Sequence, residues 1–192
     1  MSETPVFISG IGAVSAAGLT VPENLRSFAA GQRNARRTAL LDTSLTCPVF
    51  EIANLPAAPA GVEGRTAHLV RLAIQEALDG AKLPADLSGF RVGVCLGTTV
   101  ACQLNDLDFY TSYRKKQDVA MTAVDRYLKG HLAETVARAL KASGPCATVV
   151  NACSSSADAI GIGRSWLKAD LCDLVVAGGA DEMNKVPLCG FH

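Results

Sequence analysis

One cysteine of this chain, Cys153, lies where the sequence pattern changes from a strand to a helix. Residues 147–150 are short, apolar and β-branched, which is typical of a buried strand, and from residue 156 onward the apolar residues recur at helical spacing. At a helix start, unpaired backbone N–H groups and the positive end of the helix dipole favour an anion. A thiolate is such an anion, so the pattern predicts that Cys153 is a nucleophile.

The residues beside this cysteine are small, with Ala152 before it and three serines, Ser154, Ser155 and Ser156, after it. They leave room for a substrate carbon atom next to the sulfur, as covalent catalysis through a thioester requires. A buried structural cysteine is the competing interpretation, because free cysteines are among the most buried residues in proteins. The spacing alone leaves both interpretations open.

A glycine-rich turn near the N-terminus follows residues 6–11, which we expect to form a buried strand. The stretch from Gly10 to Ser15 is close to G-x-G-x-x-G, but a serine replaces the third glycine and no helix follows directly. No acidic residue ends a strand about 20 residues further on, as recognition of a nucleotide ribose requires. We therefore interpret this stretch as a tight turn after a strand and expect no cofactor.

The composition excludes several classes of protein. The 192 residues have a formal net charge of zero and 49% of them are hydrophobic, which predicts a protein with a core and argues against nucleic-acid binding. No apolar run is long enough to cross a membrane, and the N-terminus lacks the pattern of a signal peptide. The 7 cysteines include no Cys-x-x-Cys pair and no Cys/His cluster, so we expect no metal site and a reducing, cytoplasmic location.

The elements that must position Cys153 alternate between strand and helix. The expected strands are residues 6–11, 90–96, 147–150 and 174–177, and the expected helices are residues 21–31, 65–81, 118–140 and 156–167. This order predicts an α/β fold with a mainly parallel sheet that is covered by helices on both faces.

Several of these segments together resemble the β-ketoacyl-acyl carrier protein synthases, the elongating condensing enzymes of fatty-acid and polyketide synthesis. The matching segments are Gly144-Pro145, residues 150–156, residues 173–181, Gly190-Phe191, residues 6–15 and residues 91–97. The resemblance implies a thiolase-like fold of two similar halves. Residues 1–192 would then form the N-terminal half, and the C-terminal half would be absent from this chain.

The reaction that the resemblance implies is a decarboxylative Claisen condensation. Cys153 would take an acyl group from an acyl carrier protein as a thioester, and the carbanion left when malonyl-carrier loses carbon dioxide would attack that thioester. The family's two catalytic histidines belong to its C-terminal half, one of them in an HGTGT-like motif that this chain lacks. His68, His131 and His192 do not match those positions, so we assign none of them as a catalytic base.

The resemblance also assigns an acyl pocket and a set of partners. The pocket positions are Val100, Val119, Ala152 and Phe191, for which ordinary apolar core is the alternative interpretation. The implied partners are an acyl carrier protein, the C-terminal half of the same enzyme, and a related condensing-enzyme subunit in a homodimer or heterodimer. Two such subunits would pair through the strand at residues 147–150.

A non-catalytic protein that acts as an interaction or chain-length subunit is the alternative function. Family members that have lost activity commonly replace the cysteine, so the presence of Cys153 favours an acyltransferase. The short chain favours the non-catalytic alternative for this polypeptide in isolation.

Overall fold

The computed structural model describes residues 5–59, 64–84, 86–99, 107–122, 124 and 131–190. The chain divides into two compact units. The first comprises Met1–Val6 and Asp86–Asp181, and the second comprises Phe7–Ala85 and Glu182–His192. The assignment of residues 1–192 to one half of a larger fold stays a prediction.

A three-stranded parallel sheet forms the centre of the first unit. Its strands are β1 (Val92–Gly97), β2 (Cys146–Val149) and β3 (Leu174–Gly179), in the order β2-β1-β3. The register pairs Gly97 with Val149 on one side and with Gly179 on the other, so the carboxyl ends of the three strands are level. The central strand is fully buried, as its continuous run of apolar residues predicts.

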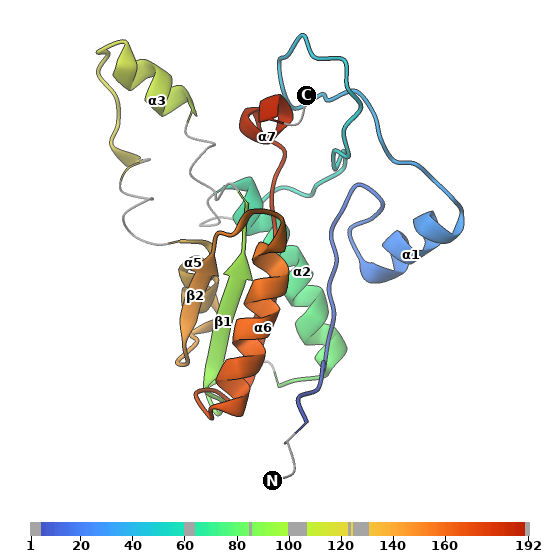
Figure 1. Cartoon of the computed structure of the whole chain (residues 1–192), viewed down its shortest axis with the longest axis vertical. Coiled ribbons are helices and arrows are strands. Elements are labelled where there is room, and N and C mark those ends of the chain that lie inside the picture. Colours follow the sequence, from blue (N-terminus) through green and yellow to red (C-terminus); the bar gives the residue numbers. More distant parts are fainter. Residues whose placement is uncertain are drawn as a thin grey trace. The chain divides into compact units, whose positions relative to one another are not determined.

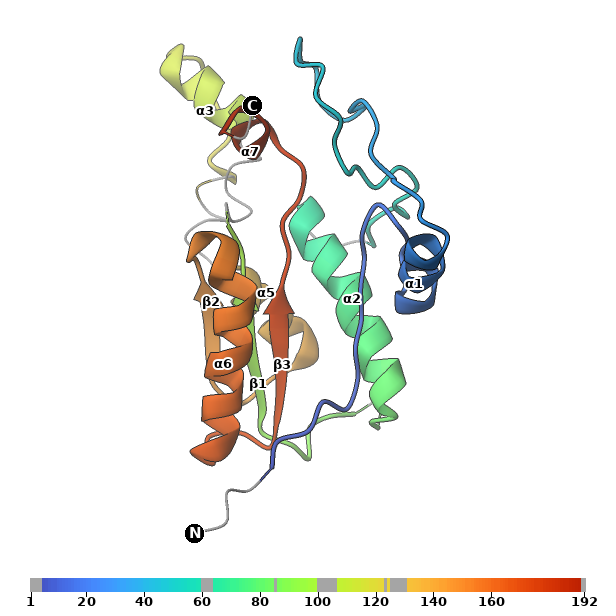
Figure 2. The same cartoon turned by 45° about the vertical axis from the view of Figure 1, so that its right-hand side comes forward.

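Helices cover both faces of this sheet (Figures 1 and 2). Helix α6 (Ser155–Lys168) packs against β1 and β3, and helix α5 (Leu132–Leu140) packs against β1 and β2 on the opposite face. Gly163 allows α6 to pack closely on the sheet, because a Cβ atom there would lie 3.0 Å from Cγ2 of Val175. The predicted α/β fold with a doubly covered parallel sheet is therefore confirmed.

Residues 118–140, which we expected to be helical in large part, are helical at 122, 124 and 132–140 among the described residues, and the helix is interrupted at His131. Residues 117–120 are irregular, and α3 (Leu107–Arg114) precedes them. Helix α5 has its own start, because the backbone N–H of His131 donates to the carboxylate of Glu134 at 2.8 Å and the His131 side chain caps the helix in return.

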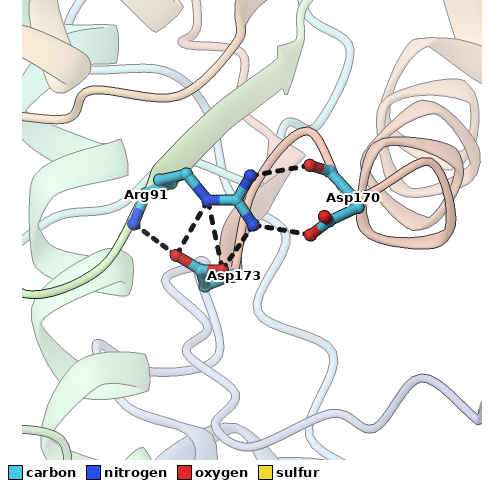
Figure 3. Close-up of polar contacts among 3 residues, drawn as sticks. All are labelled: Arg91, Asp170 and Asp173. Carbon is cyan, nitrogen blue, oxygen red and sulfur yellow. Dashed lines mark hydrogen bonds and ion pairs between the residues drawn. The ribbon is translucent and has the colours of Figure 1, made fainter.

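Arg91, just before β1, forms ion pairs and hydrogen bonds with residues just before β3 (Figure 3). These contacts lie at the amino ends of the strands, whereas Cys153 lies beyond their carboxyl ends. The Nη2 atom of Arg91 lies 2.6 Å from Oδ1 of Asp170 and 2.7 Å from Oδ1 of Asp173, while its backbone N–H donates to Oδ2 of Asp173 at 2.7 Å. These bonds raise the pKa of the Arg91 guanidinium and hold the pKa of the Asp173 carboxyl below its ordinary value. The network joins the residues that precede two paired strands far apart in the sequence.

The second unit is built around the long helix α2 (Arg65–Ala81), whose bounds the apolar spacing predicts. It also contains α1 (Val21–Ala29) and α7 (Lys185–Gly190). The carboxylate of Glu76, on α2, accepts the backbone N–H groups of Ala13 at 3.0 Å and Val21 at 2.7 Å. Helix α1 begins at the second of these residues, so one carboxylate joins the entry of α1 to α2.

Residues 6–11, which we expected to form a buried strand, lie outside the sheet. Phe7 and Ile8 are 79% and 82% exposed, and no strand in the described part of the chain pairs with them. The segment packs against a helix instead: a Cβ atom on Gly10 would lie 1.9 Å from the carbonyl oxygen of Ala77, and one on Gly12 would lie 1.8 Å from that of Ala73. This contact with the α2 backbone, rather than a tight turn after a strand, explains the spacing of the two glycines.

Candidate active site around Cys153

Cys153 lies between the end of β2 and the start of α6, as the sequence pattern predicts. A single 3₁₀ turn, Ala152–Ser154, contains the cysteine, and α6 begins at the next residue. The cysteine is exposed in this structure. The residues from Asn151 to Ser155 are called the nucleophile turn below.

The backbone of the nucleophile turn is strained immediately before the cysteine. Ala152 has φ 47°, in the left-handed region that costs a non-glycine residue about 1–2 kcal/mol. The hydroxyl of Ser155, which is only 1% exposed, accepts the backbone N–H of Asn151 at 2.8 Å and lies 2.7 Å from the carbonyl oxygen of Ala152. A strained residue persists only where its surroundings hold it, and such residues gather at functional sites.

A residue at the end of β1 also contacts the nucleophile turn, and Asp181, which follows β3, holds that end of β1 in place. The Oδ1 atom of Asp181 accepts the hydroxyl of Thr98 at 2.7 Å and the backbone N–H of Thr99 at 2.8 Å. The hydroxyl of Thr99 in turn lies 3.4 Å from the carbonyl oxygen of Ala152. Because the carboxyl ends of parallel strands meet at one edge of a sheet, residues from three strands converge on the turn that contains Cys153.

A second set of polar contacts lies on the exposed side of the nucleophile turn. The side-chain amide of Asn151 donates to Oγ of Ser154 at 2.9 Å and to Oδ2 of Asp158 at 2.7 Å, and Oγ of Ser154 lies 2.8 Å from the same carboxylate oxygen. The hydrogen bonds from Asn151 and Ser154 hold the pKa of Asp158 below its ordinary value. The sequence pattern did not predict this set, although Ser154 and Asp158 are four residues apart at a helix start.

The predicted pocket residues are only partly described. Ala152 lies in the nucleophile turn, and Val119 is half-buried in the irregular segment after α3. Val100 and Phe191 lie outside the described residues. The acyl pocket therefore stays a prediction.

Three other cysteines of the first unit differ from Cys153 in their surroundings. Burial raises the pKa of the thiols of Cys95 and Cys172, both of which lie in the core, and desolvation also raises the pKa of Cys146 at the start of β2. A raised thiol pKa reduces the thiolate fraction at neutral pH, so these cysteines are poor nucleophiles.

Neither a metal cluster nor a membrane span is found in the part of the chain that the structure describes. No group of three His, Cys, Asp or Glu residues there could hold a metal ion. None of the described helices combines the length and the apolar character that crossing a membrane requires.

Comparison with known proteins identifies the family. The family described as β-ketoacyl synthase, N-terminal domain, matches residues 25–192 of the chain. The chain belongs to the β-ketoacyl synthase family. The predicted family is thereby confirmed, and the nucleophile turn belongs to the matched part of a β-ketoacyl synthase N-terminal domain.

Relatives of this β-ketoacyl synthase domain include a polyketide synthase subunit and a 3-oxoacyl-[acyl-carrier-protein] synthase. The ketoacyl synthase alpha subunit of the tetracenomycin polyketide synthase of Streptomyces glaucescens is 26% identical over 174 residues, which cover 86% of this chain and 40% of that protein. The 3-oxoacyl-[acyl-carrier-protein] synthase 1 of Buchnera aphidicola is 25% identical over 125 residues, which cover 62% of this chain and 31% of that protein.

A solved structure confirms the thiolase-like fold of this β-ketoacyl synthase domain. The structure of the ishigamide ketosynthase/chain length factor matches with a TM-score of 0.83 and 23% identity, over 96% of this chain and 49% of the other. The chain spans less than half the length of each of these three relatives.

Proposed function

We propose that Cys153 is the acyl-accepting nucleophile of a β-ketoacyl-acyl carrier protein synthase. The observation that supports this role is an exposed cysteine in a strained turn at a helix start, held by a buried serine and by the ends of two strands. The thiolate attacks the carbonyl carbon of an acyl thioester, the new S–C bond forms, and the donor's sulfur leaves and takes up a proton. The backbone N–H of Cys153 provides half of the oxyanion hole in this proposal.

The second step joins the acyl group to a malonyl unit. Malonyl-carrier loses carbon dioxide, its carbanion attacks the carbonyl carbon of the Cys153 thioester, and the cysteine leaves as a thiolate. The two described histidines are engaged elsewhere, because Nε2 of His68 lies 2.9 Å from the carbonyl oxygen of Pro56 and His131 caps α5. We therefore assign acyl acceptance to this chain and the two histidines that stabilise the enolate to a C-terminal half of the enzyme.

The proposed partners are an acyl carrier protein and a second condensing-enzyme subunit. The name of the Buchnera relative includes the carrier, and the ishigamide structure pairs a ketosynthase with a chain length factor. Among the described strands, β2, like β3, has a partner on one side only, and Val150 at the end of β2 is 61% exposed. A second subunit that pairs with this edge would satisfy its N–H and C=O groups, in a homodimer or a heterodimer.

We extend the proposal to the acyl pocket and the location of the enzyme. Val100, Val119, Ala152 and Phe191 would contact the acyl chain, as the family resemblance implies. The 6 cysteines for which the structure describes the thiol are all free, which supports a reducing compartment such as the cytoplasm.

The test of the proposed function is transfer of an acyl group to Cys153. The 192-residue chain is incubated with an acyl carrier protein that is loaded with a labelled acyl group, and the labelled peptide is identified by mass spectrometry. We expect the label on Cys153, no label in Cys153→Ala, and wild-type labelling in Cys189→Ala, which removes another exposed thiol. Labelling that persists in Cys153→Ala would contradict the assignment.

A further inference from the structure

The carboxylate of Asp158 holds the exposed side of the nucleophile turn. We propose that Asp158 and Asn151 are positioning residues that fix the orientation of Cys153 for acyl transfer. This inference rests on the proposed function of Cys153 and adds two residues that act through it. Neither side chain belongs to the buried core that stabilises the fold, because Asn151 is exposed and Asp158 is only half-buried.

The contacts form a closed set around the peptide units of Ala152 and Cys153. The amide of Asn151 has two hydrogens, so it donates to Ser154 Oγ at 2.9 Å and to Asp158 Oδ2 at 2.7 Å at the same time. The single hydroxyl hydrogen of Ser154 is directed either to the Asp158 carboxylate at 2.8 Å or to the carbonyl oxygen of Asn151 at 3.0 Å. Asn151, two residues before the cysteine, and Ser154, directly after it, are thus joined through one carboxylate.

The position of Cys153 depends on this set because the turn is strained. The left-handed φ of Ala152, 47°, relaxes unless the residues on both sides are held. The buried hydroxyl of Ser155 holds the inner side, and Asp158 holds the outer side. Loss of the outer contacts would let the turn relax locally and rotate the Cys153 sulfur away from the reacting carbonyl carbon, while the buried sheet remains folded.

The charge of Asp158 does not favour the reaction, which points to geometry as its role. A carboxylate in the first turn of α6, next to the nucleophile turn, opposes the formation of a thiolate. Both donor groups reach the same oxygen, Oδ2 of Asp158. Asp158→Asn therefore removes the charge while its amide oxygen still accepts both hydrogen bonds, whereas Asp158→Ala removes the acceptor altogether.

The experiment compares the rate of Cys153 modification in these variants of the 192-residue chain. Two probes are used, iodoacetamide and an acetyl thioester of pantetheine, and the modified fraction of Cys153 is followed over time by peptide mass spectrometry at several pH values. The matched control is Asp86→Ala, which removes an aspartate with two comparable hydrogen bonds to Ser88 before the start of β1. Thermal unfolding of every variant is measured in parallel.

We expect Asp158→Ala and Asn151→Ala each to lower the acylation rate of Cys153 by about tenfold or more, as misplaced reacting groups do, with Asp158→Asn within about twofold of wild type. The double variant is expected to be no slower than either single variant, because both remove the same contact. Asp86→Ala should react like wild type. Modification of Cys189 should be the same in all variants.

Two results would overturn the inference. One is an unchanged Cys153 rate in Asp158→Ala and Asn151→Ala, and the other is an equal loss in Asp158→Asn and Asp158→Ala, which would make charge the relevant property. If Asp158→Ala fails to fold, the acylation rates of Asp158→Asn and Asn151→Ala are compared instead. A slow Asn151→Ala beside an Asp158→Asn that reacts like wild type supports the inference, and the absence of this difference overturns it. Failure of the proposed function is distinguishable, because the wild-type chain would then take up iodoacetamide but no acetyl group.

Discussion

The hydroxyl oxygen of Ser155 lies 2.7 Å from the carbonyl oxygen of Ala152 and accepts the backbone N–H of Asn151 at 2.8 Å. One buried side chain therefore satisfies polar groups on both sides of the strained residue. We expect Ser155→Ala to lower the free energy of unfolding by about 1–3 kcal/mol, because it removes the hydrogen bonds of the Ser155 hydroxyl with Asn151 and Ala152. Urea unfolding measures this, with Ser165→Ala on the exposed face of α6 as the control. Equal stabilities of the two variants would refute the assigned role.

Cys153 is expected to be the most reactive thiol of the chain. It combines exposure with a position at a helix start, whereas burial raises the pKa of Cys95 and Cys172. Brief alkylation at neutral pH followed by peptide mapping should show Cys153 modified first. Preferential labelling of Cys95 or Cys172 would show that the exposed turn does not determine reactivity.

The 192-residue chain by itself should accept an acyl group without forming a carbon–carbon bond. Condensation requires groups that stabilise the enolate, and the described histidines are held at Pro56 and at the start of α5. Mass spectrometry of the product after incubation with acyl-carrier and malonyl-carrier checks this. A β-ketoacyl product from the pure chain would be incompatible with the proposed division of roles.

Substitution of the N-terminal glycines should disturb the contact with α2. Gly10→Ala and Gly12→Ala would place a Cβ atom against the backbone carbonyl groups of Ala77 and Ala73, so we expect a loss of about 1–3 kcal/mol, as in other overpacked sites. Gly80→Ala is the matched control on α2, since nothing lies within 4 Å of its added Cβ atom, and it should stabilise the helix by up to about 1 kcal/mol. Chemical denaturation compares the three variants, and a neutral effect of Gly12→Ala would contradict the packing.

The buried carboxylate of Glu51 should make stability depend on pH. Burial raises its pKa, but hydrogen bonds from Thr38, Leu40 and Ala39 outweigh burial and hold the pKa below the ordinary value of 4.5. A lowered pKa in the folded state means that the ionised carboxylate stabilises the fold above about pH 4.5, and that this contribution is lost as the pH falls through the folded pKa.

Glu51→Gln isolates this charge, because all three donors reach one oxygen, Oε2, which an amide oxygen can replace. We expect the difference in unfolding free energy between wild type and Glu51→Gln to be largest at neutral pH and to shrink in acid. Urea unfolding at a series of pH values measures it. A difference that does not vary with pH would rule out the ionised form as the source of the stability.

Local patterns in the sequence determined the main elements and the place of the cysteine. Apolar β-branched runs predicted β1, β2 and β3, and the apolar spacing predicted the bounds of α2. The change from a strand to small residues and then to a helix placed Cys153 at the turn. These features depend on neighbouring residues, whose steric preferences and side-chain periodicity act along the chain.

Contacts between distant residues were decided only by the tertiary structure. Residues 6–11 read as a strand, yet a strand exists only where another strand pairs with it, and here α2 takes that place. Asp181 bonds Thr98 across 83 positions, so no local spacing indicates it. Such contacts arise because parallel strands bring their carboxyl ends to one edge, which places the side chains that hold Cys153 together only after the sheet has formed.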